Sequence, residues 1–457
     1  MKLVRLALLL LLLPAAGALA DRPRVEREFQ KTLPLATGKR LRVEHSSGEV
    51  AVKTHPGSEV RIHAWIRVSA SPQSTAQEFA DAIQIEAEAD SGGVSVRTRY
   101  PERRVIVNIS YSVDYEIDMP AGALLDVRNR FGSVSAVGVK GGTSVENANG
   151  SVTLREGGGT QQVTSSFGSV TVTGAAGDLT VTNANGDVIV TGVDGAAELT
   201  TRFGKVVAKS VSGKVNVTGG NGDVTVTDSG TASITTSFGA IRFNNVKSMR
   251  CVGANGNVTG SKVAGAVSVR NSFGAVDLSD VGGRLEVHNA NGNVKVRGVR
   301  GAAQLETSFG VIDAEGIGGD LTAENSNGGI GARSVEGSAR VRTTFGAVNL
   351  SEISGAVDVD DSNGSIDVRE PGRAGADCRP ITLKTSFGTV KIALPESAGY
   401  DVDARTSFGS IQSDFSLSAD RELSSSAMRG KIGDGRCKLV IANSNGGVQI
   451  LRGGGRR

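Results

Sequence analysis

The feature that most constrains this chain is one short phrase repeated at a fixed spacing. An Asn-Gly pair alternates with a Phe-Gly pair, with a half-step of 18 residues and a full step of 36 through most of the array. A fixed period in this range is the signature of a repeat architecture. The repeated residues are Phe131, Asn149, Phe167, Asn185, Phe203, Asn221, Phe238, Asn255, Phe273, Asn291, Phe309, Asn327, Phe345, Asn363, Phe387, Phe408 and Asn445.

Each repeat contains two short stretches in which apolar and polar residues alternate. Counted from the Asn or Phe as position 0, apolar residues stand at −6, −4, +3, +5 and +8, as at Val188, Val190 and Val193. Gly stands at +1 and again near +10. Alternation with a period of two predicts short strands with one buried face, and Gly supplies the backbone angles that corners need. We therefore predict an all-β fold, a single-stranded parallel β-helix or solenoid with about 18 residues per turn.

Two other all-β folds are compatible with parts of this pattern. Asn-Gly between alternating strands is a strong hairpin signal, which would give an antiparallel meander. A propeller would use repeats of about 40 residues, but it rarely exceeds eight blades. A parallel stack best explains why the same residue type returns at the same place, and seventeen corners at about 4.8 Å per turn imply a rod of roughly 80 Å.

Strict alternation also predicts where the Phe and Asn side chains point. Positions −6, −4, −2 and 0 should share one side, so the residues at position 0 are expected to point inward at one corner. The Phe rings would then fill volume, and the Asn amides would satisfy backbone groups of the turn. We assign these residues a structural role as a ladder.

The first 20 residues have the form of a secretory signal peptide. Lys2 and Arg5 precede an apolar run over residues 6–13, and Ala18-Leu19-Ala20 resembles a cleavage site. The alternative is a membrane anchor, for which the apolar run is short. We predict export through a cleaved signal peptide to the periplasm, the outer membrane or the exterior, with no membrane span in the mature chain.

The remaining chain divides into a cap and a repeat array. Residues 21–123 are expected to form a β-rich cap with one short helix, capped by Ser71 or Ser74 and burying Phe79, because a solenoid needs an atypical unit at its end. Residues 124–457 form the array, with insertions near 371–380 and 414–438. The repeat at Asn445 is expected to end the array, covered by the second insertion or by the basic tail.

These features together resemble the bacterial putative-adhesin family of unknown function, whose members are exported β-solenoids. The resemblance rests on the degenerate turn Ser47-Gly48-Glu49-Val50, on Ile117-Asp118-Met119-Pro120 before the array, on the strand–helix–strand cap and on the repeats. It covers nearly the whole mature chain. It implies a fold and supplies no catalytic residues.

Three cysteines remain to be placed. Cys251 stands where other repeats carry Val or Leu, so a buried apolar role is expected. Cys378 and Cys437 both lie in segments that interrupt the repeat. In an exported protein they can form a disulfide, and the alternative is two unpaired thiols.

Few residues suggest chemistry. Asp277 and Asp313 lie two turns apart in one outward column, near the upper end of the separation of an inverting carboxylate pair, but Lys295 stands between them, which favours a ladder of alternating charge. Glu306 and Glu324 are stacked like charges, which Arg342 or a calcium ion would neutralise.

Other classes of site find no motif in the sequence. His45, His55 and His63 have no standard zinc spacing and are expected at exposed strand positions. The formal charge of +3 falls to +1 without Lys2 and Arg5, which gives no electrostatic footprint for nucleic acid. No nucleophile–base motif, phosphate loop or paired-Cys motif appears. We predict no catalytic residue, cofactor or metal.

The predicted function is that of a non-enzymatic, exported cell-envelope scaffold. It would be an adhesin-like monomeric rod that binds glycan or protein, and no enzyme. One alternative is a polysaccharide-active β-helix enzyme, which would need a cleft of acidic residues. A second alternative is an envelope assembly or stress component that polymerises through bare end turns.

Overall fold

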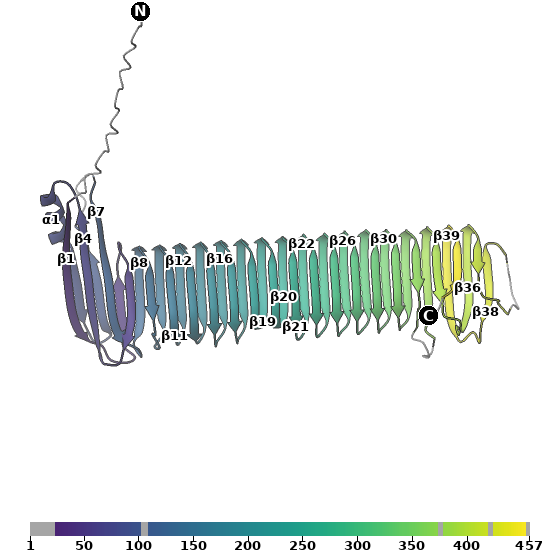
Figure 1. The fold of residues 1–457 in the computed structure, drawn as a ribbon, viewed down its shortest axis with the longest axis horizontal. Helices are drawn as coiled ribbons and strands as arrows, with labels where there is room; N and C mark the ends of the chain where they lie inside the picture. Colours follow the sequence, from purple (N-terminus) through teal and green to yellow (C-terminus); the bar gives the residue numbers. More distant parts are fainter. Residues whose placement is uncertain (1–22, 102–107, 373–377, 419–423, 454–457) are drawn as a thin grey trace, which may run out of the picture.

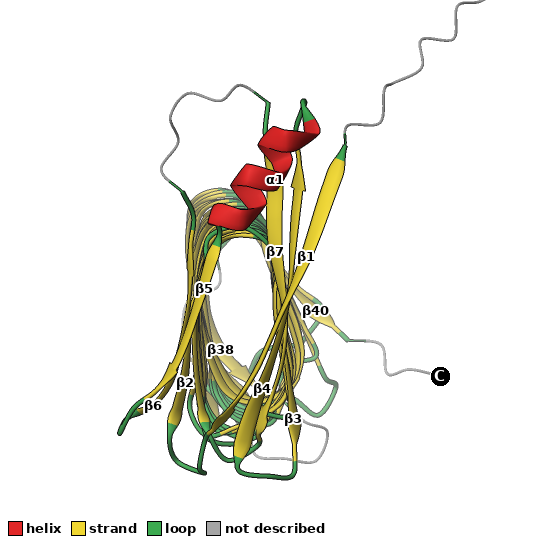
Figure 2. Ribbon diagram, turned by 90° about the vertical axis from the view of Figure 1, so that its left-hand side faces the viewer, coloured by secondary structure: helices red, strands yellow, loops and turns green. Residues whose placement is uncertain are grey.

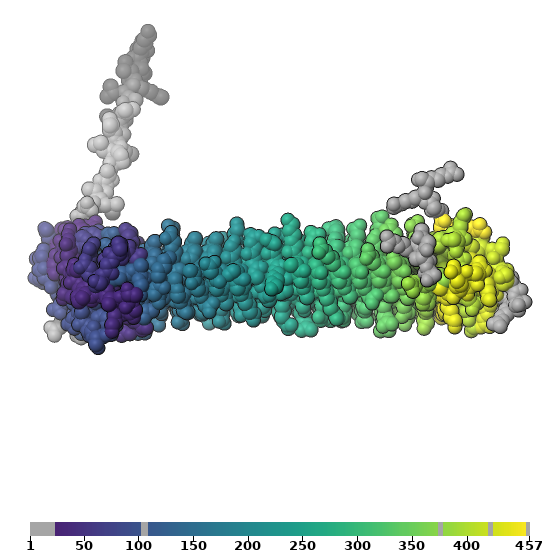
Figure 3. Space-filling model, turned by 90° about the horizontal axis from the view of Figure 1, so that it is seen from below, coloured from purple at the N-terminus to yellow at the C-terminus, as the bar shows by residue number. Residues whose placement is uncertain are grey.

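The computed structural model describes residues 23–101, 108–372, 378–418 and 424–453. The predicted signal peptide, residues 1–20, lies outside these ranges. The described chain forms a straight rod of stacked rungs, with the N-terminal cap at one end and the C-terminal strands at the other (Figures 1 and 3). The predicted all-β parallel solenoid is confirmed, and the meander and propeller are excluded, because strands of successive rungs pair in parallel.

Each rung contributes one strand to each of two walls that face one another. Figure 2 looks along the rod and shows the rungs superimposed around a flattened interior. The first wall comprises β8 (Leu124–Phe131), β10 (Thr143–Asn149), β12 (Gln161–Phe167), β14 (Leu179–Asn185), β16 (Ala197–Phe203), β18 (Val215–Asn221), β22 (Val267–Phe273), β24 (Leu285–Asn291), β26 (Ala303–Phe309), β28 (Leu321–Asn327), β30 (Ala339–Phe345), β32 (Val357–Asn363), β34 (Ile381–Phe387), β36 (Tyr400–Phe408) and β39 (Cys437–Asn445).

The second wall is built from the strands that follow the Gly at position +1. These are β9 (Val134–Val137), β11 (Val152–Gly158), β13 (Val170–Ala176), β15 (Val188–Val193), β17 (Val206–Val211), β21 (Val258–Val263), β23 (Val276–Val281), β25 (Val294–Val299), β27 (Ile312–Ile317), β29 (Ile330–Val335), β31 (Val348–Ile353), β33 (Ile366–Arg369), β35 (Val390–Leu394), β37 (Ile411–Ser413) and β40 (Val448–Arg452). Two strands, β19 (Val224–Phe238) and β20 (Ile241–Asn255), run through both walls.

The core lies between the walls and consists of the alternating apolar residues. Val188, Val190 and Val193 are all fully buried, as the alternation predicts. Cys251 is also buried and unpaired, in line with its expected apolar role. A thin core of Val, Leu, Ile and Ala thus runs the length of the rod and joins one rung to the next.

The cap extends both walls and covers the open end. β2 (Arg40–Glu44) and β3 (Val50–His55) form a first rung below β8 and β9. β6 (Gly93–Arg99) and β5 (Gln84–Ala89) extend the first wall, and β7 (Ser110–Pro120), β4 (Glu59–Ser69) and β1 (Arg24–Pro34) extend the second.

One helix, α1 (Gln73–Ala82), lies along one edge of the cap, against β1 and β4 (Figure 2). It buries Ala76, Phe79 and Ala80, so the predicted helix and the predicted burial of Phe79 are confirmed. The predicted cap at Ser71 or Ser74 is wrong, because Pro72 precedes the helix and no side chain caps it. Within the described ranges no helix is long and apolar enough to cross a membrane.

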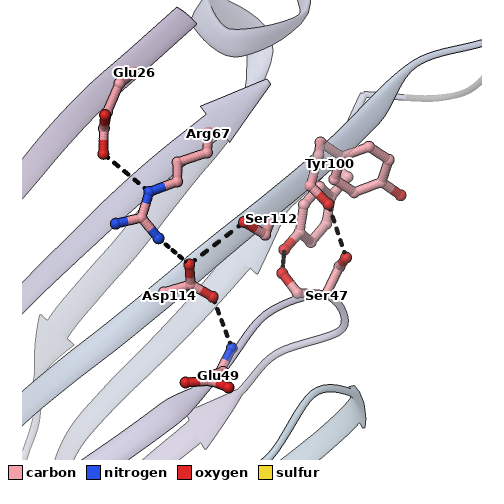
Figure 4. Close-up of polar contacts among 8 residues, drawn as sticks. Glu26, Ser47, Glu49, Arg67, Tyr100, Ser112 and Asp114 are labelled. Atoms are coloured by element: carbon pink, nitrogen blue, oxygen red, sulfur yellow. Dashed lines mark hydrogen bonds and ion pairs between the residues drawn. The ribbon is translucent and has the colours of Figure 1, made fainter. Parts of the chain in front are cut away.

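A polar network ties the cap to the first rung (Figure 4). The Asp114 carboxylate accepts a hydrogen bond from the backbone N–H of Glu49 at 2.9 Å and pairs with Arg67, which also reaches Glu26 at 2.9 Å. The Tyr100 hydroxyl donates to the Ser47 carbonyl at 3.1 Å. The turn of the first rung is therefore held by Asp114 of β7 and, through it, by Arg67 of β4 and Glu26 of β1, as well as by the rung above it.

The end of the array departs from sequence order. β39 lies between β34 and β36, and β40 lies between β35 and β37, so the last repeat of the sequence is inserted one rung before the end of the rod. The expectation that the Asn445 repeat ends the array is therefore wrong. The last rung contains β36 and β37, and the outer edge of β36 is covered by β38 (Ala427–Ile432), from the second insertion, which pairs with it in antiparallel fashion.

A disulfide joins the two interrupting segments. Cys378 and Cys437 have sulfur atoms 2.03 Å apart and Cα atoms 5.9 Å apart. The bond links the chain just before β34 to the start of β39, which are neighbours in the first wall. It therefore fastens the inserted rung to the rung beside it.

Candidate functional site

Each rung has two corners, where the chain turns from one wall to the other and the regular strand pattern is interrupted. The first corner follows position 0 and is turned by the Gly at +1, as at Gly292, where φ is +137°. A Cβ built on Gly292 would lie 2.2 Å from the backbone oxygen of Gly274 in the rung below. Gly is therefore required here by close backbone approach as well as by its backbone angle.

The residue at position −2 is buried behind this corner and holds it together. The Asn183 amide donates to the carbonyls of Gly168 and Gly186 at 3.0 and 2.9 Å, and so bridges two rungs. Thr307 plays the same part through its hydroxyl, which donates to Gly292 at 3.2 Å. We call this column of Asn, Thr and occasional other residues the amide column.

The Phe side chains at position 0 point outward, so the prediction that they fill the interior is wrong. Their exposed fractions run from 48% at Phe203 to 75% at Phe408. Strict alternation fails because the chain turns between position −2 and the Gly at +1, and the amide column already fills the corner. The amide column bonds the buried carbonyls of the turn, and the Asn amides at position 0 donate to backbone carbonyls on the outside of the rod.

The Asn side chains at position 0 bond along the outside of the rod. Asn185 donates to the Ser166 carbonyl in the rung below at 3.3 Å, and Asn291 donates to Ser272 at 3.4 Å. Each accepting carbonyl belongs to the residue just before a Phe. The Asn residues therefore fix the backbone beside each ring without rising as far from the surface as the ring does.

In space, Phe and Asn alternate without a break over all seventeen rungs that carry them. The sequence order Phe387, Phe408, Asn445 breaks the alternation, but the insertion of β39 restores it as Phe387, Asn445, Phe408. We call this continuous outward row the aromatic ridge. The structure thus brings all seventeen predicted ladder residues into one column.

The ridge is bordered by small and uncharged residues. From Phe238 to Phe408 the positions −1, +1 and +2 carry Ser, Thr, Ala, Gly, Asn and one Val, with no charged residue in any of the eleven rungs. Charged residues make up 21% of the whole chain. Such a strip is therefore unusual for this surface, and its rings stand clear of their neighbours.

The second corner turns the chain from the second wall back to the first. Position +7 adopts a left-handed conformation in rung after rung, with φ of +55° at Lys262, +55° at Asp280, +70° at Gly316 and +57° at Ser334. A Cβ on Gly316 would meet its nearest atom at 3.6 Å, an ordinary contact. Side chains are therefore tolerated at this corner, and they vary from rung to rung.

An open groove runs along this second corner. It spans six rungs, encloses a cavity volume of about 1080 Å³, and its floor includes Gly298 and Gly316. Charged residues of both signs line it, including Lys262, Asp280 and Arg300. The groove was not predicted from the sequence, although the three-residue spacing between the apolar positions +5 and +8 indicates irregular backbone beside it.

Of the outward columns singled out from the sequence, one alternates in charge and the other contains ion pairs. Asp277, Lys295 and Asp313 occupy successive rungs in register. Glu306 lies 2.6 Å from the His288 ring and Glu324 lies 3.9 Å from Arg342, so each stacked Glu has its own cation.

His288 sits between two carboxylates. It also contacts Glu286 at 2.8 Å. Partial burial opposes its charge, but the hydrogen bonds to Glu286 and Glu306 outweigh this and raise the pKa of His288. Among the residues that the structure describes, no group of His, Cys, Asp and Glu is arranged to hold a metal ion.

Two titratable residues occupy the amide column where other rungs have Asn or Thr. His45 is buried in the first rung, so the expectation that it is exposed is wrong, and burial lowers its pKa to about 4. Asp361 is buried in β32, and burial raises the pKa of its carboxyl to about 6. Neither residue was singled out for this role, although the spacing to Gly48 and Gly364 was the available signal.

Of the comparisons with known proteins, the match to a family model supports this architecture. A search of curated proteins finds no match. A solved structure of a putative cell adhesion protein from Clostridium sporogenes aligns over 94% of this chain and 100% of its own at 8% identity, with a TM-score of 0.20, too low to compare the two folds. Residues 283–451 match the family model described as Toastrack DUF4097. This part of the chain is thus similar to the Toastrack DUF4097 family, which confirms the predicted resemblance to a β-solenoid repeat family of unknown function.

Proposed function

We propose that this chain is an exported, non-enzymatic scaffold of the cell envelope that binds an extended polymer, a glycan or a protein segment, along its rod. The observation that carries the proposal is the groove at the second corner. Export is supported by the signal-peptide pattern of residues 1–20. A rigid solenoid is well suited to a scaffold role because each rung is held by its neighbours over the full length.

The dimensions of the groove fit a polymer better than a compact ligand. Its six rungs correspond to roughly 25 Å along the rod, at about 4.8 Å for each rung. It is open along one side, so a chain can lie in it without threading. Several weak contacts made by one polymer add up through high effective concentration.

The lining of the groove supports recognition of a polar ligand. Lys262 and Arg300 supply donors, and Asp280 and Glu336 supply acceptors, from four different rungs. Gly298 and Gly316 leave room on the floor because they have no side chain. Hydroxyl-rich sugars or a polar peptide backbone can form hydrogen bonds with such a surface.

The charge ladders on the walls support binding over catalysis. Lys295 stands between Asp277 and Asp313 on the second wall, and His288 or Arg342 accompanies each Glu of the column on the first wall. The two carboxyls of a glycosidase need different states, one protonated and one ionised. A cation between them favours the ionised form of both, so it opposes the protonated state that the general acid needs.

The test is binding of the purified chain to a glycan array and to isolated peptidoglycan, with the same mixtures assayed for released sugar. The informative variant is Gly298→Asn with Gly316→Asn, which fills the floor of the groove. Asn tolerates the left-handed conformation of these positions. The matched control is Gly174→Asn with Gly192→Asn, which have the same conformation but lie outside the groove.

Saturable binding without released sugar, weakened about tenfold or more by the groove variant and unchanged by the control, is the expected result. Release of sugar would overturn the non-enzymatic assignment. Equal binding by the groove variant and the parent chain would show that the groove is not the binding site. Absence of glycan binding would leave an extended protein segment as the ligand, tested with the same pair of variants against a library of unstructured peptides.

A further inference from the structure

We propose that the aromatic ridge is a self-docking surface, through which two copies of this chain pair side by side in antiparallel orientation. The ridge is on the opposite edge of the rod from the groove, so pairing leaves the groove open. This inference goes beyond the proposed function and revises the expectation of a monomer.

The first observation is the shape of the ridge. Phe rings recur on every second rung, which places them about 9.6 Å apart along the rod. The shorter Asn side chains between them leave a gap opposite each Asn. A ring inserted midway into such a gap would lie about 4.8 Å from the ring on either side, within the spacing that aromatic pairs prefer.

The second observation is that this pattern is complementary to itself. In an antiparallel pair related by a twofold axis between the rungs of Phe309 and Asn327, each Phe of one copy faces an Asn of the other. Phe309 then faces Asn327, and Phe273 faces Asn363. The rod is straight (Figures 1 and 3), so the match continues along the whole contact. A twofold contact of this kind closes on itself and forms a dimer.

The third observation is where the charges stop. Near the cap the border of the ridge carries Arg130, Asp187, Arg202, Lys205 and Asp223. From Phe238 onward it carries none. Burial of unpaired charge is costly, so the uncharged stretch is the part that can be covered by another copy. The proposed axis centres the contact on this stretch.

The fourth observation is the area available. Five rings face the uncharged stretch of the other copy, each more than half exposed: Phe238, Phe273, Phe309, Phe345 and Phe387. With about 200 Å² for each aromatic side chain, they would bury roughly 500 to 550 Å² on each copy. The pair would bury about 1,100 Å² before the small flanking residues are added, which is above the roughly 1,000 Å² expected of a specific interface.

The first test is the mass of the purified chain in solution by sedimentation equilibrium, without any ligand. A dimer is expected at micromolar concentration. The variant Phe273→Ser/Phe309→Ser/Phe345→Ser is expected to weaken dimerisation by about 100-fold or more, since it removes the three central rings. Its circular dichroism and melting temperature should stay close to those of the parent, because these rings are outside the core.

The control variant changes three outward residues of the second wall in the same part of the rod, Arg297→Ser/Glu315→Ser/Arg333→Ser, and should remain a dimer. A parent chain that is monomeric at 100 µM, taken here as roughly the limit for a functional contact, would overturn the proposal. A ridge variant that dimerises as tightly as the parent would overturn it too. Because no ligand is present, these outcomes are independent of the groove experiment.

The second test fixes the orientation with single cysteines. Cys251 is buried and Cys378 is bonded to Cys437, so an introduced surface cysteine is the reactive thiol among the described residues. Asn327→Cys lies beside the proposed axis and should be linked to its counterpart by a short bis-maleimide. Asn149→Cys lies far from the axis and should not be linked. Equal linkage at both positions would indicate parallel pairing and contradict the proposed arrangement.

Discussion

The two corners of the rung show two different ways for a backbone to turn. Both use positive φ, but the first corner has Gly in every rung, whereas the second has Glu156, Ser210, Lys262 or Gly316 at the equivalent place. The difference lies in what surrounds the Cβ position. It would strike backbone about 2.2 Å away at Gly292, whereas at Gly316 it would meet its nearest atom at 3.6 Å, an ordinary contact. Close approach, more than backbone angle, therefore fixes the repeated phrase.

As a result, the two corners present different surfaces to other molecules. The first corner is uniform, so its outward residues form one regular ridge. The second corner accepts many side chains, so its charges and its depth change along the rod and a groove can exist over six rungs. Regularity suits pairing with another copy, and variation suits recognition of a different molecule.

The largest effect on stability is expected when the same substitution is made at each corner, Gly292→Ala at the first and Gly316→Ala at the second. At Gly292 the new methyl meets backbone that cannot move aside, and a loss of more than about 4 kcal/mol in the stability of the neighbouring rungs is expected. At Gly316 the loss should be about 1 to 2 kcal/mol, the cost of the left-handed backbone alone, because the methyl makes only ordinary van der Waals contacts.

The effect of each substitution is measured by amide hydrogen exchange in strands β22 to β28 and by the melting temperature of the chain. Exchange resolves single rungs, which matters because a solenoid can open locally. Equal effects of the two substitutions would show that backbone angle alone sets the Gly requirement at the first corner.

The next effect concerns His45, which stands in the amide column of the first rung. Its folded pKa of about 4 lies below the ordinary value of 6.5, so the unfolded chain binds the extra proton more readily. Stability from the neutral ring is fully present above pH 6.5 and is lost as the pH falls toward 4, by about 3 kcal/mol in all. Melting of the cap should therefore fall over this range more steeply than in His45→Gln.

The control for that experiment is His55→Gln, which changes a partly exposed histidine of the same cap outside the amide column. Identical pH profiles for the parent and His45→Gln would rule out a buried neutral imidazole at the first corner. The comparison also tests whether the cap and the array lose stability together, since the array has no equivalent histidine.

A smaller effect is expected from Asp361→Asn, which restores the usual residue of the amide column. The folded pKa of Asp361, about 6, lies above its ordinary value of 3.8, so stability associated with the protonated carboxyl is present below pH 3.8 and lost as the pH rises through 6. At pH 7 the variant should be more stable by about 2 kcal/mol, because its amide can also donate to the Gly carbonyls as Asn183 does.

This gain should shrink as the pH falls below 6. Asp358→Asn, which changes an outward carboxyl of the same strand that pairs with Arg340, serves as the control and should leave the pH profile unchanged. A stabilisation that is equal at pH 7 and pH 4.5 would mean that desolvation of the carboxylate is not the cause.

Much of the fold was predictable from the sequence because the same pattern of alternating apolar residues and fixed Gly positions occurs in repeat after repeat. Alternating apolar residues such as Val188 and Val190 could be buried only as strands, and equal spacing could be satisfied only by stacking like positions above one another. The Gly at +1, the burial of Cys251 and the helix around Phe79 follow from the same local rules.

The sequence by itself thus determined the walls, the period and the parallel stack, because these depend on residues that repeat in register. Only the tertiary structure decided which way the Phe rings point, because the pleat ends where the chain turns and parity no longer applies. It also decided that the Asn445 rung sits between those of Phe387 and Phe408, since that choice depends on which strand edges are open. The ridge and the groove arise from these corners, where backbone path rather than residue pattern sets the geometry.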